Sequence, residues 1–256
     1  MSLVRNFWKS QLGKKVVMAT TGLIGVGFVI GHMAGNLQVF EGPERFNSYA
    51  HLLHGPLGNE LWLVRLVLIA AVVLHVTAAV QLTRQKQAAR PAASGYKKWE
   101  PQVSTFASRS IRWGGAYLLV WLVFHILHFT ARAIFRDYSE TDVYGNVVKG
   151  FSHPAIVAAY VVAMFFLGLH LYHGAWSSVR TLGLSRPRPR PTSRNVATVV
   201  AVLVSLGFVA VPLAVLFGVV KPRADSATAG TAAAAAAPAP GAPVPGAPAP
   251  SVAAGR

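Results

Sequence analysis

The chain has 256 residues, of which 53% are hydrophobic and only 12% are charged, and its formal net charge is +16. A soluble domain usually carries about 25% charged residues, and the basic residues here lie between apolar runs of membrane length, which argues against a nucleic-acid-binding face. The sequence contains no cysteine, which excludes disulfides, thiolate-held iron–sulfur clusters and covalently attached c-type haem. We therefore expect an all-α integral membrane protein in which any redox cofactor is held by nitrogen or oxygen ligands.

Five apolar runs predict five transmembrane helices, because each run is long enough to cross a bilayer. The first resembles a signal peptide only at its start, since its apolar part is too long and no clear cleavage site follows. Pro154 marks the start of the fourth helix. The expected helices cover about residues 16–38, 61–83, 113–135, 154–179 and 196–220 of a membrane domain, 1–223, which is followed by a disordered tail rich in alanine and proline, 224–256.

The distribution of basic residues predicts the orientation. Sixteen of the twenty-four lysines and arginines lie in the amino-terminal segment, in residues 84–112 and in residues 180–194. These segments all fall on one side of a five-helix topology. The positive-inside rule then places the amino terminus in the cytoplasm and the carboxyl tail outside, in the cell inner (cytoplasmic) membrane.

Four of the apolar runs contain a histidine well inside the membrane, where an ionisable side chain is costly and indicates a functional site. At about 1.5 Å per residue, His32 and His125 lie toward the outer leaflet, and His75 and His170 toward the cytoplasm. In an up-down-up-down bundle of the first four helices, the first and third helices face each other diagonally, as do the second and fourth.

Each depth thus receives one histidine from each side of the bundle. Two neutral imidazoles that face each other across a bundle form an axial ligand pair for a haem iron. We therefore predict two b-type haems, the outer one held by His32 and His125 and the inner one by His75 and His170.

Other interpretations of the histidines remain open. A single membrane histidine more often hydrogen-bonds a neighbouring helix, and zinc is a competing metal. Without cysteine and with few intramembrane carboxylates, however, the usual four zinc ligands are hard to assemble. His128 and His173 lie three residues beyond His125 and His170 on nearly the same helix face. Either could be the ligand instead, or could hydrogen-bond a haem propionate.

Several segments carry a family likeness. They are GHMAGNL and FNSYAHLLHG, LHV in the second helix, SRSIRWGG leading to FHILHF in the third, and LHLYHGAWSSVRTLG in the fourth. In order and spacing, over about residues 13–184, the chain resembles the five-helix, two-haem cytochrome b subunit of succinate:quinone oxidoreductases, the membrane anchor of succinate dehydrogenase and fumarate reductase. Matched motif by motif, the family ligands fall on His32, His75, His125 and His170.

The resemblance implies a non-catalytic electron-transfer subunit. Succinate would be oxidised by a flavoprotein (FAD) subunit, and an iron–sulfur subunit would pass electrons to the inner haem. This chain would anchor both partners in membrane lipid and reduce a quinone, expected to be menaquinone, at the outer haem. The alternatives are the haem b subunit of another respiratory dehydrogenase, such as a hydrogenase or formate dehydrogenase, and a transporter or channel whose histidines relay protons.

Several arginines are further candidates. Arg65 and Arg132 either extend their charged groups to the membrane interface or pair with a propionate of the outer haem. Arg180 could hold a propionate of the inner haem, although the positive-inside rule alone also predicts arginines on that side. The same holds for Arg84, Arg109 and Arg112.

Two groups of residues have two interpretations each. His51, His54 and Glu60 are either ordinary loop residues or proton donors to a quinone at the outer mouth. Gly27, Gly31 and Gly35 recur every four residues, which predicts either close helix packing or clearance for a flat macrocycle beside His32.

Overall fold

The computed structural model describes residues 2–89, 106–184 and 191–223, and these residues form helices and turns without any β-strand. By its contacts the chain divides into Met1–Lys221 and Pro222–Arg256, and the description below concerns the first unit. The predicted tail, 224–256, and the middle of the basic segment, 90–105, lie outside the described residues.

Five long helices dominate the structure, and each is long and apolar enough to cross a membrane. This confirms the prediction of an all-helical chain with five candidate spans. Large apolar side chains such as Leu63, Ile69 and Val120 are more than half exposed, as expected where lipid rather than water surrounds a helix. The spans are α2 (Gln11–Leu37), α4 (Gly58–Ala88), α5 (Phe106–His125) with its continuation η2 (Ile126–Thr130), α7 (Pro154–Thr181) and α8 (Pro191–Leu216).

The helix ends follow from local chemistry. The Ser10 side chain accepts a hydrogen bond from the Gly13 amide at 2.8 Å and so caps α2. Pro154 begins α7, as predicted. The third span ends at Thr130 and not near residue 135, because the π-helical turn η2 is followed by Arg132 in the left-handed backbone region, with φ 54°.

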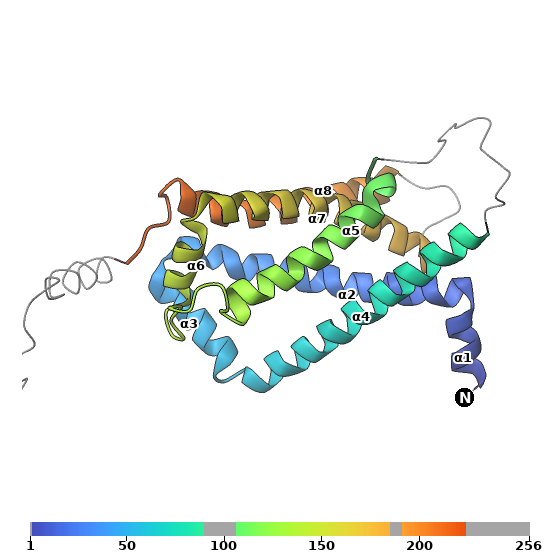
Figure 1. Cartoon of the computed structure of the whole chain (residues 1–256), viewed down its shortest axis with the longest axis horizontal. Helices are drawn as coiled ribbons and strands as arrows, with labels where there is room; N and C mark the ends of the chain where they lie inside the picture. The colour runs from blue at the N-terminus through green and yellow to red at the C-terminus, as the bar shows by residue number, and fades with distance from the viewer. Residues whose placement is uncertain (1, 90–105, 185–190, 224–256) are drawn as a thin grey trace, which may run out of the picture. The chain divides into compact units, whose positions relative to one another are not determined.

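The long helices α2, α7 and α8 lie side by side, and α4 and α5 are inclined to them (Figure 1). Helix α2 packs against α4, α7 and α8, and α7 packs against α5 and α8. Within the described residues, neither α2 with α5 nor α4 with α7 forms an extensive backbone contact. These two pairs of helices therefore meet through their side chains, across the space between the other helices.

Short helices close the two ends of the bundle. At one end, which we call the cap end, lie η1 (Gln38–Glu41), α3 (Pro43–His54) and α6 (Val143–Phe151), and at the other lies α1 (Ser2–Lys9) (Figure 1). The sequence analysis expected no helix in residues 39–60 or 136–153, which lie between the predicted spans. In the structure α6 is almost wholly buried, and its apolar face contributes to the core at the cap end.

Asn47 of α3 joins the two short helices of the cap end. Its amide nitrogen donates to the Asp142 carboxylate at 2.9 Å, and its amide oxygen accepts from the Tyr144 backbone N–H at 2.9 Å. The Tyr144 hydroxyl donates in turn to the Lys221 carbonyl at 2.9 Å, just beyond α8. The cap end is thus held by polar contacts between segments far apart in the sequence.

Candidate functional site

His32 of α2 and His125 of α5 meet near the cap end. Their ring centres are 5.9 Å apart with the planes at 76°. Phe28 stacks on the His32 ring at 5.3 Å, and Trp121 stacks on the His125 ring at 5.1 Å. The Asn36 amide nitrogen lies 3.4 Å from His32 Nδ1 and donates to the His32 carbonyl at 2.6 Å. Aromatic rings therefore stack on both histidines, and the Asn36 amide is a polar neighbour of His32.

His75 of α4 and His170 of α7 form the second pair, with ring centres 6.1 Å apart. His75 Nδ1 lies 3.1 Å from the Met18 carbonyl and 3.2 Å from the Thr21 hydroxyl, both on α2. A ring N–H that donates to a backbone carbonyl fixes the tautomer and leaves the other nitrogen, Nε2, free to bind a metal. His170 Nδ1 is buried and has no hydrogen-bond partner within the described part of the chain.

Two glycines, Gly22 and Gly115, show how far apart the two histidine pairs lie along the bundle. A Cβ atom on Gly22 would lie 3.3 Å from His75 Cε1, and one on Gly115 would lie 3.6 Å from His170 Cε1. Residues 22 and 32 on α2, and residues 115 and 125 on α5, are each ten positions apart. At about 1.5 Å per residue the two histidine pairs therefore lie about 15 Å apart along the bundle.

The spacing within each pair is suited to one metal ion between two imidazoles. Two imidazoles that bind a metal from opposite sides, through bonds of about 2 Å, have ring centres about 6 Å apart. No cluster of three or more histidine, aspartate or glutamate side chains able to hold a metal occurs in the described ranges. Within these ranges, a metal held by either pair would have two histidine ligands.

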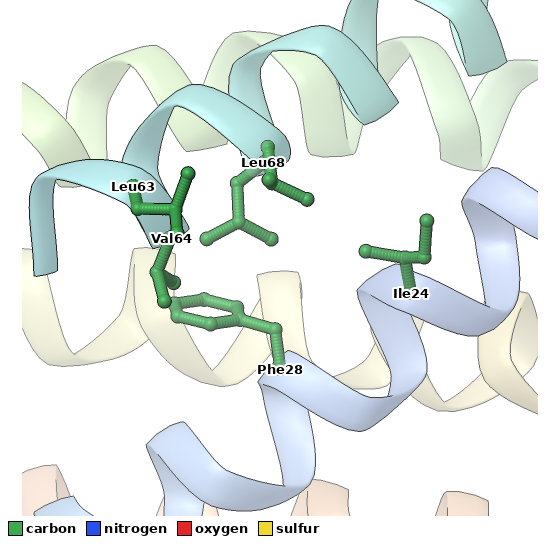
Figure 2. Close-up of a pocket in the computed structure, with 6 residues that line it drawn as sticks. Ile24, Phe28, Leu63, Val64 and Leu68 are labelled. Atoms are coloured by element: carbon green, nitrogen blue, oxygen red, sulfur yellow. The ribbon is translucent and has the colours of Figure 1, made fainter. Parts of the chain in front are cut away.

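An apolar pocket lies one side chain away from His32. A pocket of about 370 Å³ lies between α2 and α4, and Figure 2 shows Ile24 and Phe28 facing Leu63, Val64 and Leu68 across it. Every residue that lines the pocket is apolar, and Phe28 also stacks on His32.

The three regularly spaced glycines of α2 have different surroundings. A Cβ on Gly27 or Gly31 would meet nothing within 4 Å, whereas one on Gly35 would lie 2.7 Å from the Tyr49 hydroxyl. Gly35 thus serves close packing against α3, while the first two glycines border open space.

His128 has a different environment from His125. Its ring is fully buried, with Nδ1 at 2.9 Å from the Tyr160 hydroxyl and Nε2 at 3.0 Å from the Tyr138 hydroxyl. The Tyr160 hydroxyl also lies 3.1 Å from His125 Nδ1. The sequence analysis named no tyrosine and missed Tyr160, although it precedes His170 on α7 by ten residues, the spacing of the two levels.

Three of the other predicted residues, His173, Arg180 and Arg132, lie toward the two ends of the bundle. Near the α1 end, the His173 ring lies 6.2 Å from Trp176, and the guanidinium groups of Arg180 and Arg194 lie 5.1 and 4.9 Å from the Trp176 ring. Toward the cap end, Arg132 pairs with Glu140 at 2.9 Å.

Two other groups of predicted residues remain apart from the histidine pairs. The Arg65 guanidinium lies over Trp62 at 4.9 Å, on the same helix. His51 and His54 end α3, and His54 Nδ1 lies 2.8 Å from the Ala50 carbonyl of its own helix. Glu60 lies in the first turn of α4.

Comparison with known proteins gives one informative relative. The chain is 26% identical over 203 residues to the succinate dehydrogenase cytochrome b558 subunit of Bacillus subtilis (strain 168), and the alignment covers 78% of this chain and 92% of that subunit. The chain is thus a distant homologue of a subunit of succinate dehydrogenase, which confirms the resemblance that its motifs indicated. No family model matches the chain, and no solved structure matches it.

Proposed function

We propose that this chain is the di-haem cytochrome b membrane anchor of a succinate dehydrogenase. In this role it takes electrons from the iron–sulfur subunit and delivers them through two b haems to a quinone, for which we propose menaquinone. The observation that supports this most is the presence of two histidine pairs across the bundle, each with ring centres about as far apart as two ligands of one iron. The homology to a cytochrome subunit of the same enzyme supports it independently.

Each histidine pair would bind one haem. His32 and His125 would hold one haem, and His75 and His170 the other. A bound haem b supplies a one-electron iron couple. The Met18 carbonyl orients the His75 ring so that Nε2 is available, and Phe28, which stacks on His32, also lines an apolar pocket between α2 and α4.

Four further side chains are proposed as partners for the haem carboxylates: His173, Arg180, Arg65 and Arg132. Arg180 and His173 lie toward the α1 end, on the side of His75 and His170, while Arg65 and Arg132 lie toward the cap end. A cation near a buried carboxylate offsets part of its desolvation cost.

We further propose that the amino terminus and the α1 end face the cytoplasm, where the flavoprotein (FAD) and iron–sulfur subunits would bind. The proposal follows from the excess of lysine and arginine in the amino-terminal segment and in the segments that follow α4 and α7 in the sequence. The His75–His170 pair would then be nearer to the iron–sulfur subunit, and the His32–His125 pair nearer to the outer surface and the quinone.

Purification of the chain from a haem-competent host tests the first part of this proposal. We expect about two haems b per chain and a reduced-minus-oxidised spectrum of the low-spin type. Pure, folded protein without haem would refute it and would favour a proton-relaying transporter.

Co-purification tests the assignment to succinate dehydrogenase. We expect the chain to be recovered with a flavoprotein and an iron–sulfur subunit, and succinate to reduce its haems in that complex. Reduction by hydrogen or formate, with no response to succinate, would instead assign the chain to another respiratory dehydrogenase.

A further inference from the structure

Three polar side chains, Tyr160, His128 and Tyr138, form a hydrogen-bonded chain that begins at His125. His125 Nδ1 lies 3.1 Å from the Tyr160 hydroxyl, which lies 2.9 Å from His128 Nδ1, and His128 Nε2 lies 3.0 Å from the Tyr138 hydroxyl. His128 is completely buried, and Tyr160 and Tyr138 are only 6% and 8% exposed. Because buried polar groups need partners, these groups must satisfy one another.

If His125 binds a metal through Nε2 and the Tyr160 O–H donates within this chain, the hydrogen bonds can run in one direction only. A neutral imidazole has one N–H and one acceptor nitrogen, and a phenol has a single O–H. Metal binding at Nε2 puts the His125 proton on Nδ1, so His125 donates to the Tyr160 oxygen. The Tyr160 O–H then donates to His128 Nδ1, and the His128 Nε2–H donates to the Tyr138 oxygen.

The opposite direction is incompatible with metal binding. If Tyr160 donated to His125 Nδ1, the His125 proton would be on Nε2 and would block the metal. His128 in turn has hydroxyl groups within hydrogen-bond distance of both ring nitrogens, so metal binding by His128 would break one of these bonds.

We propose that Tyr160, His128 and Tyr138 are positioning residues that hold His125 in the tautomer with its proton on Nδ1 and strengthen electron donation from its Nε2 to a haem iron. This rests on the proposed function. An acceptor on the distal N–H of a ligand histidine raises the basicity of the ligand, and successive hydrogen bonds polarise one another. Greater donation stabilises ferric iron and so lowers the midpoint potential of the haem that His125 holds.

The His75–His170 level has no equivalent chain among the described residues. His75 Nδ1 meets a backbone carbonyl and a threonine hydroxyl on α2, and His170 Nδ1 meets no partner there. We therefore expect the midpoint potential to be lowered only at the haem that His125 holds. The haem held by His75 and His170 then serves as an internal reference in the same molecule.

The test is potentiometric titration of the purified two-haem protein carrying Tyr160→Phe. We expect both haems to be retained, the midpoint potential of one to shift upward, and the other to stay unchanged. Tyr117→Phe is the matched control, since its hydroxyl donates to the Ala159 carbonyl at 3.5 Å and is hydrogen-bonded to no histidine in the described part of the chain. This control should shift neither potential.

Tyr138→Phe keeps the test decisive if Tyr160→Phe fails to assemble. It removes the last acceptor but leaves Tyr160 and His128 in place, so the same haem should shift in the same direction by a smaller amount. Unchanged or lowered potentials in the assembled variants would overturn the inference. Wild-type protein without haem would instead refute the proposed function, which distinguishes the two failures.

Discussion

The two histidine pairs have nearly the same ring spacing, 5.9 Å and 6.1 Å, but very different surroundings. The pair near the cap end is enclosed by aromatic rings, and its His125 contacts a tyrosine hydroxyl. The pair near the α1 end lies against two glycines and a backbone carbonyl. Helix packing thus sets the distance between partners, while the neighbouring side chains set the chemistry of each pair.

The largest effect should come from removing the histidines themselves. His75→Ala and His170→Ala should each remove the same haem and leave the other intact, whereas His32→Ala and His125→Ala should both remove the second one. The measurement is haem content per chain together with the difference spectrum of each variant. Loss of different haems in His75→Ala and His170→Ala would refute the pairing.

A bulkier residue at Gly22 should affect only the level near the α1 end. Because even a Cβ there would lie 3.3 Å from the His75 ring, Gly22→Val must displace that ring and should remove most of the haem that His75 holds. Haem quantification and the potential of the remaining haem measure this outcome. The control is Leu23→Val, which introduces the same β-branched residue at an exposed position. Equal haem loss in both variants would show a general helix defect.

Removing the contacts between α3 and α6 should weaken the cap end. Asn47→Ala deletes two hydrogen bonds and leaves the Tyr144 N–H without its partner, which should reduce the free energy of unfolding by about 1–3 kcal/mol. Thermal unfolding in detergent measures the change. Thr198→Ala, which removes only a hydrogen bond within α8, should cost less, and an equal loss would contradict the role assigned to Asn47.

The smallest effect is expected at alkaline pH. Burial, with help from the nearby Asp142 and Glu44 carboxylates, raises the pKa of Tyr144 above its ordinary value. In the folded state Tyr144 then keeps its hydroxyl proton at pH values at which the unfolded chain loses it. The free energy of unfolding is therefore unaffected below about pH 10 and falls as the pH rises further. Tyr144→Phe should be slightly less stable at pH 8 but should lose less stability between pH 8 and 11. Parallel curves for the two proteins would contradict this.

Much of the architecture could be read from the sequence because apolar length is a local property. Five runs of membrane length predicted the five candidate spans, and the depth of each histidine along its run predicted which rings would approach each other. The short helices α3 and α6 were missed, since their apolar faces are too short to stand out and become buried only against the ends of the long helices.

The sequence by itself therefore determined the all-helical class, the five candidate membrane spans and the position of four histidines along them. Only the tertiary structure decided that Tyr160 of α7 lies between His125 and His128, and that Gly22 and Gly115 make room for the other two rings. The reason is that contacts between helices depend on how each helix is rotated about its own axis, and this rotation results from the packing of all the helices together.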